Sequence, residues 1–274
     1  MNLPRALFVM LCLLLLNLPA LAQDSGTPDS SDSTTAMPDS LYRWVPNDSF
    51  GLGEYLKFAI GYGFISAGYA TLAIPDTVTH NGHLCYRILN ETASNSFVDR
   101  FYKVRDTSFS YMDVDGLYAH YFRKSLHEGS YNSHREVEFD YCNMAAWYRK
   151  DAEAIDTLEL VPFTQDVLSA VYYLRTQKLE VGDTWTVPTI PGDTLTNLLV
   201  KVLDREEIDV PAGRFDCLIL EPLLTATGIF KHEGQIKVWV TDDRLHMPVL
   251  MKSKVLVGSI YAELEEFRLG TLDW

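Results

Sequence analysis

Residue types that carry out covalent catalysis are present in this sequence, but their spacing does not match the motifs that use them. The stretch Gly63–Gly68 places Ser66 between glycines, with one residue too many before the serine for the G-x-S-x-G turn of hydrolases. It also lies between two segments with strand-like alternation, whereas that turn joins a strand to a helix. We interpret the stretch as a glycine-rich hairpin corner and predict no catalytic residue.

Histidines and carboxylates also bind metal ions, and their spacing along the chain gives no metal site. His80 and His83 flank the Asn81-Gly82 turn, but no second pair of His or Cys follows at zinc spacing. Glu263 and Glu265 alternate with apolar residues, which is typical of a solvated strand face. A calcium ion held by oxygen ligands stays open as an alternative. We predict no metal and no cofactor.

One group of residues favours ligand binding. Asp166, Tyr172, Tyr173 and Arg175 fall in or next to one predicted helix, 166–176, and further aromatic residues lie on segments expected to be neighbouring strands. A helix over the concave face of a curved sheet can enclose an apolar cavity. These four residues are therefore the candidate ligand or core-lid residues. The alternative is that the aromatic side chains simply fill the core. The other aromatic residues considered are Phe101, Tyr102, Tyr118, Tyr121 and Phe122.

Arg175 has three possible roles that the sequence leaves open. Its guanidinium can anchor the acidic head of an apolar ligand through a charge-assisted contact. It can solvate an exposed helix face, in which case its removal has little effect on stability. It can also form a structural ion pair, for which Asp106 and Glu128 are candidate partners.

The signals for the helix are local. Asp166 can cap its first turn, because a carboxylate accepts the free backbone N–H groups there. We expect an apolar stripe at helical spacing to face the sheet, with Tyr172 and Arg175 pointing elsewhere. The stripe consists of Val167, Ala170, Val171 and Leu174.

Elsewhere the chain alternates with period two, the pattern of half-buried strands. Turns are expected at Ser66-Ala67-Gly68, Asn81-Gly82 and Asp115-Gly116. The predicted fold is mainly β: a curved antiparallel sheet or half-barrel of about a dozen strands, with one short helix packed on it. The strands are expected near residues 56–62, 70–74, 84–91, 104–112, 117–126, 135–141, 198–204, 214–221, 235–241, 248–257 and 259–267.

The N-terminal residues predict export. Residues 1–22 have the order of a secretory signal peptide: one positive charge, a short apolar run and small residues at Ala20-Leu21-Ala22. We expect cleavage between Ala22 and Gln23 and a location in the periplasm, or otherwise in the cell envelope of a Gram-negative bacterium. Residues 23–41 form a Ser/Asp/Thr/Pro-rich acidic tether that is expected to be disordered. Residues 42–274 are expected to form a single β domain, with no later segment long and apolar enough to span a membrane.

The net charge and the cysteine content limit the possible partners and the possible disulfide bonds. The formal net charge is −14, and removing residues 1–22, which carry one arginine and no acid, makes it −15. Such a chain repels phosphate backbones, so we expect no nucleic-acid partner. Cys85, Cys142 and Cys217 remain after cleavage, an odd number from which no disulfide pairing follows. Cys217 alternates with apolar residues and is expected to be a small buried side chain.

The chain resembles the exported bacterial proteins grouped as domain of unknown function 3108. The resemblance covers most of residues 42–269, and the helix segment is its most specific part. It implies a curved antiparallel sheet, similar in shape to the half-barrels of envelope lipoproteins and lipoprotein carriers, and it implies no catalytic residues. The matching stretches are 53–58 through 68–72, Phe101–Asp106, Gln165–Arg175, Pro211–Phe215 and Val238–Asp243 through 248–249.

Three function classes follow. The first is a non-catalytic binding or carrier module for an apolar, lipid-like envelope molecule, which rests on the expected cavity. The second is a structural or assembly partner in the envelope, which would show an exposed apolar patch or a long unpaired edge strand. The third is an uncharacterised hydrolase, for which no catalytic constellation is present in the sequence.

Overall fold

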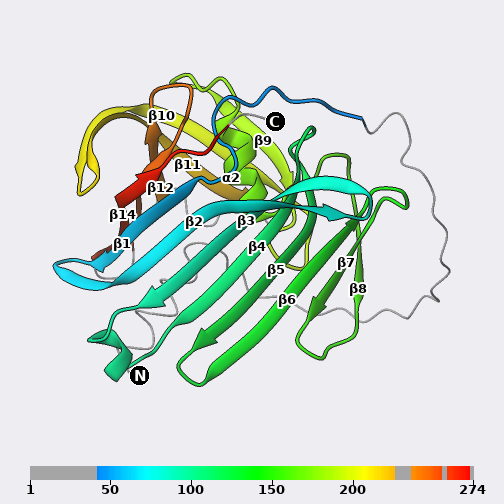
Figure 1. The fold of residues 1–274 in the computed structure, drawn as a ribbon, viewed down its shortest axis with the longest axis horizontal. Helices are drawn as coiled ribbons and strands as arrows, with labels where there is room; N and C mark the ends of the chain where they lie inside the picture. The colour runs from blue at the N-terminus through cyan, green and yellow to red at the C-terminus, as the bar shows by residue number, and fades with distance from the viewer. Residues whose placement is uncertain (1–41, 226–235, 255–257, 272–274) are drawn as a thin grey trace.

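The computed structural model describes residues 42–225, 236–254 and 258–271, which form one antiparallel sheet of fourteen strands around a short helix (Figure 1). Neighbouring strands follow the order β8-β7-β6-β5-β4-β3-β2-β1-β14-β13-β12-β11-β10-β9, so the sheet is an open half-barrel with β8 and β9 at its edges. The predicted fold class is confirmed.

The signal peptide, its cleavage site and the acidic tether lie outside the described residues, as do the predicted strand ends at Gln235 and 255–257. The strands are β1 (Tyr55–Tyr62), β2 (Ile65–His80), β3 (His83–Ser94), β4 (Arg105–Asp113), β5 (Ala119–Glu128), β6 (Tyr131–Asp140), β7 (Ala145–Lys150), β8 (Asp156–Glu159), β9 (Thr184–Thr189), β10 (Thr196–Val210), β11 (Gly213–Thr225), β12 (Ile236–Thr241), β13 (Pro248–Lys254) and β14 (Ser259–Arg268).

Hairpin turns set most of the order, and one predicted turn is wrong. Asn81 and Gly82 both have positive φ, 48° and 85°, as the tight turn between β2 and β3 requires. The turn between β1 and β2 lies at Gly63 and Phe64, however, and Ser66–Gly68 belong to β2. Gly68 is needed for a different reason: a Cβ there would lie 2.1 Å from the carbonyl oxygen of Ala93 on β3. The glycine-rich stretch 63–68 therefore contains a turn at Gly63 and, at Gly68, a close approach of β2 to β3.

Several strands were missed because they lack the expected alternation or are short. β7, β8 and β9 have four to six residues, and β9 contains a proline. β10 continues well beyond the predicted end at Asp204, because a register shift between Val202 and Asp204 lets the strand bend and go on. The short 3-10 helix η2 (Val98–Arg100) follows β3.

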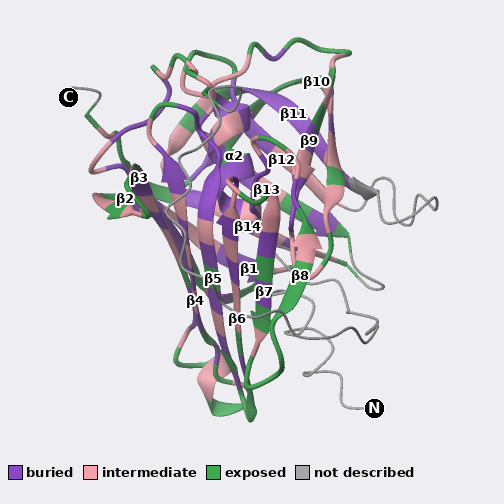
Figure 2. Ribbon diagram, turned by 90° about the vertical axis from the view of Figure 1, so that its right-hand side faces the viewer, coloured by how far each residue is buried: buried purple, intermediate pink, exposed green. Residues whose placement is uncertain are grey.

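The helix α2 (Val167–Arg175) lies inside the curve of the sheet, with strands of both halves around it (Figure 1). Figure 2 shows buried residues gathered around α2 and exposed residues at the far tips of the β3–β6 hairpins. The predicted apolar stripe is only partly correct. Leu174 and Ala170 are buried, but Val171 is 39% exposed. Tyr172 and Arg175, which were expected to point away, are buried because the residues before β1 cover that side of the helix.

Two further sequence expectations concern cysteines and the membrane. Cys85, Cys142 and Cys217 are free, and Cys217 is buried as expected. In the described ranges, no helix combines the length and the apolar character needed to cross a membrane.

Candidate functional site

The candidate site is built around α2, and the residues that precede the helix fix its position between the two halves of the sheet. Ala119 of β5 donates its backbone N–H to the carbonyl of Thr164 at 3.1 Å. Gln165 donates to the carbonyl of Pro188 on β9 and accepts from the N–H of Ile190. The lead-in segment therefore bridges strands far apart in the sheet order and holds α2 across one end of the half-barrel.

Asp166 starts the helix and is a structural residue. Its Oδ1 accepts the backbone N–H groups of Leu168 and Ser169, and its backbone N–H donates to the Ser169 hydroxyl, which completes a capping box. Its Oδ2 accepts the hydroxyl of Ser110 on β4 at 2.5 Å. Burial raises the pKa of Asp166 to about 6. The hydrogen bonds favour the ionised form and lower the pKa, but burial has the larger effect. Both oxygens are engaged by the protein, so Asp166 does not face a ligand.

Arg175 forms a buried ion pair, and its partner is neither of those considered from the sequence. Nη1 and Nη2 lie 2.7 and 2.8 Å from the two carboxylate oxygens of Glu54, and both side chains are almost wholly buried. Nη2 also donates to the carbonyl of Ser49, and Nε donates to that of Leu245. Burial alone would lower the pKa of Arg175, but the attraction of Glu54 outweighs it and raises that pKa. All three nitrogens are therefore committed to the protein.

Tyr172 and Tyr173 belong to the packing of the helix. Tyr172 has no exposed surface, and its ring meets Phe50 edge-on with centroids 4.8 Å apart. Tyr173 is partly buried, and the guanidinium carbon of Arg43 lies 4.9 Å from its ring centroid. The structure brings all four candidate residues together at α2, but in core and capping roles.

The other aromatic residues do not line one cavity. Tyr118 and Phe122 are buried in the core, whereas Tyr121 is half-buried and packs against Tyr111. Phe101 is 70% exposed and lies in the turn after η2. The alternative that the aromatic side chains fill the core holds for Tyr118 and Phe122, whereas the expected place of Phe101 on a strand is wrong, because Phe101 lies in the turn after η2.

An apolar pocket lies between α2 and the concave face of β10–β13. Leu174 and Val171 of the helix face Val200, Leu220 and Val240 of the sheet across a cavity of about 100 Å³. An apolar cavity of this order accommodates a small apolar group such as one aromatic ring. It is smaller than the roughly 300–1,000 Å³ of a site that encloses a whole drug-sized ligand. The pocket can therefore take one end of an apolar molecule.

Polar groups at the pocket wall are already hydrogen-bonded within the protein. Arg175 and His246 border the pocket, and His246 donates from Nδ1 to the carbonyl of Arg175 at 2.9 Å. Sequence reasoning missed the wall formed by β10–β12. Alternation at Leu198, Val200 and Val202 indicates a buried face, but it does not say which helix side chains lie opposite.

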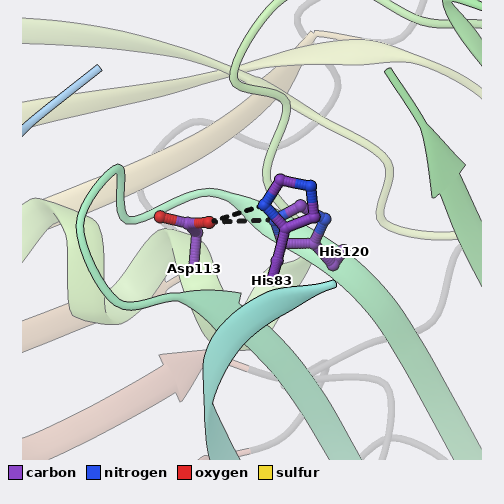
Figure 3. Close-up of side chains that lie close together, drawn as sticks. All are labelled: His83, Asp113 and His120. Atoms are coloured by element: carbon purple, nitrogen blue, oxygen red, sulfur yellow. Dashed lines mark hydrogen bonds and ion pairs between the residues drawn. The ribbon is translucent and has the colours of Figure 1, made fainter. Parts of the chain in front are cut away.

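Among the described residues, two histidines and one aspartate form a group that could hold a metal ion. His83 at the start of β3, Asp113 at the end of β4 and His120 of β5 point toward one another (Figure 3). Asp113 Oδ2 accepts from His120 Nε2 at 3.1 Å and lies 3.6 Å from His83 Nδ1. Burial opposes ionisation of Asp113, but the hydrogen bonds from His120 and the Gly116 N–H, together with the nearby His83 imidazole, outweigh it and hold the pKa of Asp113 well below the usual range. Burial lowers the pKa of His120.

One of the solved structures found by comparison has a similar fold. The crystal structure of a β-barrel-like protein of domain of unknown function DUF1849 from Brucella abortus is similar, with a TM-score of 0.55 and 10% identity over 81% of this chain and 100% of that chain. A lipoprotein candidate from Parabacteroides distasonis has a TM-score of 0.29, 10% identity and coverage of 83% and 100%. A candidate exported protein with a YmcC-like fold from Bacteroides fragilis has a TM-score of 0.25, 13% identity and coverage of 82% and 99%.

At the level of sequence, a comparison with curated proteins finds no match. The model of a family described as a protein of unknown function, DUF3108, matches residues 57–265. This match spans most of the chain, from β1 to β14, and includes α2 and both walls of the pocket. The chain therefore belongs to the DUF3108 family.

Proposed function

We propose that the protein is an exported, non-catalytic binding or carrier protein for an apolar, lipid-like molecule of the cell envelope. The observation that carries the proposal is the apolar pocket between α2 and β10–β13. Its walls are aliphatic side chains from several elements, and such a concave surface binds ligands chiefly by removing apolar area from water. The location in the envelope rests on the signal peptide predicted from residues 1–22.

The chemistry of the pocket wall favours a neutral apolar group as the part that enters. Arg175 is the cation at the wall, and its nitrogens donate to Glu54, Ser49 and Leu245. An acidic headgroup at that place would have to displace a buried, bidentate carboxylate, which costs several kcal/mol. The pocket is therefore suited to the end of an acyl chain or to a ring, with the rest of the molecule at the mouth.

Binding is tested with the fluorescent probe N-phenyl-1-naphthylamine and a variant that fills the pocket. Val200→Phe places a ring in the cavity and should weaken probe binding by roughly tenfold. The ring prevents the probe from contacting the pocket wall, and those apolar contacts are worth more than about 1.4 kcal/mol. Val181→Phe is the matched control, because Val181 is 41% exposed and is not among the pocket residues. Circular dichroism checks that both variants fold. Equal probe affinity of the Val200→Phe variant and the wild type would contradict the proposal.

The natural ligand is sought by native mass spectrometry of the wild-type protein purified from its own envelope. A co-purified mass that is reduced in the Val200→Phe variant and retained in the Val181→Phe variant is the expected result. A protein that carries no additional mass, and that also fails to bind the probe, would exclude the carrier function. Intact mass in the same experiment tests whether the mature chain begins at Gln23.

A structural or assembly role in the envelope is the second candidate, and one observation favours it. The β1–β2 turn exposes Phe64, and the neighbouring η2 segment exposes Phe97 and Phe101. The two segments are adjacent, because the side chain of Asn95 donates to the carbonyl of Ser66. The sheet edges do not favour assembly by strand addition: β8 has four residues, two of them acidic, and β9 contains a proline.

This second role makes a separate prediction. Replacing Phe64 and Phe101 with Ser should abolish co-purification of a protein partner and leave probe binding unchanged, since neither residue borders the pocket. Loss of probe binding in that variant, with the fold intact, would mean that the exposed aromatic residues serve the ligand instead.

A further inference from the structure

We propose that His83, Asp113 and His120 form a binding site for a divalent transition-metal ion of the zinc class. Two imidazole nitrogens and one carboxylate oxygen are a common ligand set for zinc. The three ligand atoms, His83 Nδ1, Asp113 Oδ2 and His120 Nε2, lie within 4.8 Å of one another. The site lies on β3, β4 and β5, and none of the three residues lines the apolar pocket.

The distances fit a tetrahedral ion. Ligand atoms about 2.0–2.1 Å from a tetrahedral zinc ion lie about 3.3–3.4 Å from one another. Asp113 Oδ2 lies 3.1 Å from His120 Nε2 and 3.6 Å from His83 Nδ1, one value on each side of that spacing. The third pair of ligand atoms, His83 Nδ1 and His120 Nε2, also lies within 4.8 Å.

The backbone is shaped to bring His120 to this place. On β5, Ala119 pairs with Met112 of β4 and Tyr121 pairs with Tyr111, which leaves His120 as the extra residue of a β-bulge. A bulge redirects a side chain that regular alternation would send to the other face. His120 is buried and its ring stacks on that of His83, with centroids 4.4 Å apart. The bulge therefore places a histidine next to the ends of two neighbouring strands.

The carboxylate is held by a second layer of hydrogen bonds. Asp113 Oδ1 accepts the backbone N–H groups of Asp115 at 3.0 Å and Gly116 at 2.6 Å, so the turn after β4 fixes the orientation of the carboxylate. Its other oxygen is thereby directed at the two imidazoles. Outer hydrogen bonds of this kind orient metal ligands in known sites.

Solvent can reach the site from one side. The side chain of His83 is 30% exposed, whereas those of Asp113 and His120 are 12% and 4% exposed. An ion can enter past His83, and three protein ligands leave a fourth position for water. Each neutral imidazole binds through its unprotonated nitrogen, so the ring proton moves to the other nitrogen when the ion enters.

The test uses Zn²⁺ with the purified full-length protein, followed by isothermal titration calorimetry and native mass spectrometry. The expected result is one Zn²⁺ per chain and a rise in melting temperature that a chelator reverses. His83→Gln and Asp113→Asn should each weaken binding by roughly tenfold or more, since loss of even an outer partner costs about that much. Asn at position 113 keeps Oδ1 as the acceptor for the turn, and His83 is partly exposed, so both variants should fold.

The matched control is His127→Gln. His127 lies on β5 next to His134, an exposed histidine pair that could also attract zinc. This variant should retain the wild-type affinity and stoichiometry, and cobalt-substituted protein should keep the same visible spectrum. Zinc binding that is lost in the His127→Gln variant but unchanged in the His83→Gln variant would overturn the proposal. Absence of saturable binding to the wild type at micromolar Zn²⁺ would also overturn it.

Discussion

The two sides of α2 differ in how they contact the protein. We define the anchored side as Asp166, Tyr172 and Arg175, which contact β4 and the residues before β1 through polar groups and rings. The open side consists of Val171 and Leu174, which face aliphatic side chains of the sheet across a cavity. One side is therefore fixed by directional bonds, and the other is held by non-directional apolar contacts.

This difference suits a protein that admits an apolar molecule. A buried ion pair loses several kcal/mol when its atoms separate, so the anchored side resists displacement. Aliphatic contacts next to a cavity can be exchanged for contacts with a ligand at little cost, because both surfaces are apolar. The helix can thus keep its place in the half-barrel while its open side accommodates a guest.

The largest expected effect is at the ion pair of the anchored side. Arg175→Met leaves the Glu54 carboxylate buried without its partner and should reduce the free energy of unfolding by about 3–5 kcal/mol, measured by urea denaturation. The double variant Glu54→Leu, Arg175→Met removes both charges and should be more stable than the single variant. A single variant within about 1 kcal/mol of the wild type would mean that this side is not anchored by the pair.

A comparable test on the open side uses two neighbouring positions. Leu174→Ala should lower the free energy of unfolding by about 3 kcal/mol, because the side chain is 7% exposed and packs in the apolar cluster of β10–β12. Val171→Ala should cost less than about 0.5 kcal/mol, since Val171 is 39% exposed. Equal effects at the two positions would contradict the orientation of the helix.

The anchored side should also make stability depend on pH through Asp166. Its pKa in the folded protein, about 6, is above the ordinary value of 3.8, so folding favours the protonated form. The stabilisation from proton binding is fully present below about pH 4 and is lost as pH rises through about 6; it amounts to at most about 3 kcal/mol. Asp166→Asn keeps the cap and should remove this component. Parallel pH profiles of the two proteins in thermal unfolding would contradict the assignment.

Local signals in the sequence predicted the parts of the fold that depend on neighbours in the chain. The cap at Asp166 located α2, and Asn81-Gly82 located the β2–β3 turn, because each needs only a few adjacent residues. The Glu54–Arg175 pair joins residues 121 positions apart, and no local pattern indicates it. The sequence set His83 aside as a metal ligand because no second His or Cys pair follows it at zinc spacing. Its pairing with Asp113 and His120 depends on the register of three strands and on one bulge.

A last variant tests whether the anchored side is held mainly by its ion pair or by all of its polar groups together. The Tyr172 hydroxyl is buried, and within the described part of the chain it has no hydrogen-bond partner. Its burial, followed by the nearby Glu54, raises its pKa well above the ordinary value, so the hydroxyl stays protonated and uncharged. Removing a buried polar group that lacks a partner costs little and can be favourable, because its desolvation is avoided.

Tyr172→Phe keeps the ring against Phe50 and should change the free energy of unfolding by less than about 1 kcal/mol, in either direction. Urea denaturation of this variant and of Arg175→Met compares how much the Tyr172 hydroxyl and the ion pair each contribute to the free energy of unfolding. A loss of about 2 kcal/mol or more would assign the hydroxyl a bonding role, and the ion pair would then be one member of a larger polar network rather than the anchor itself.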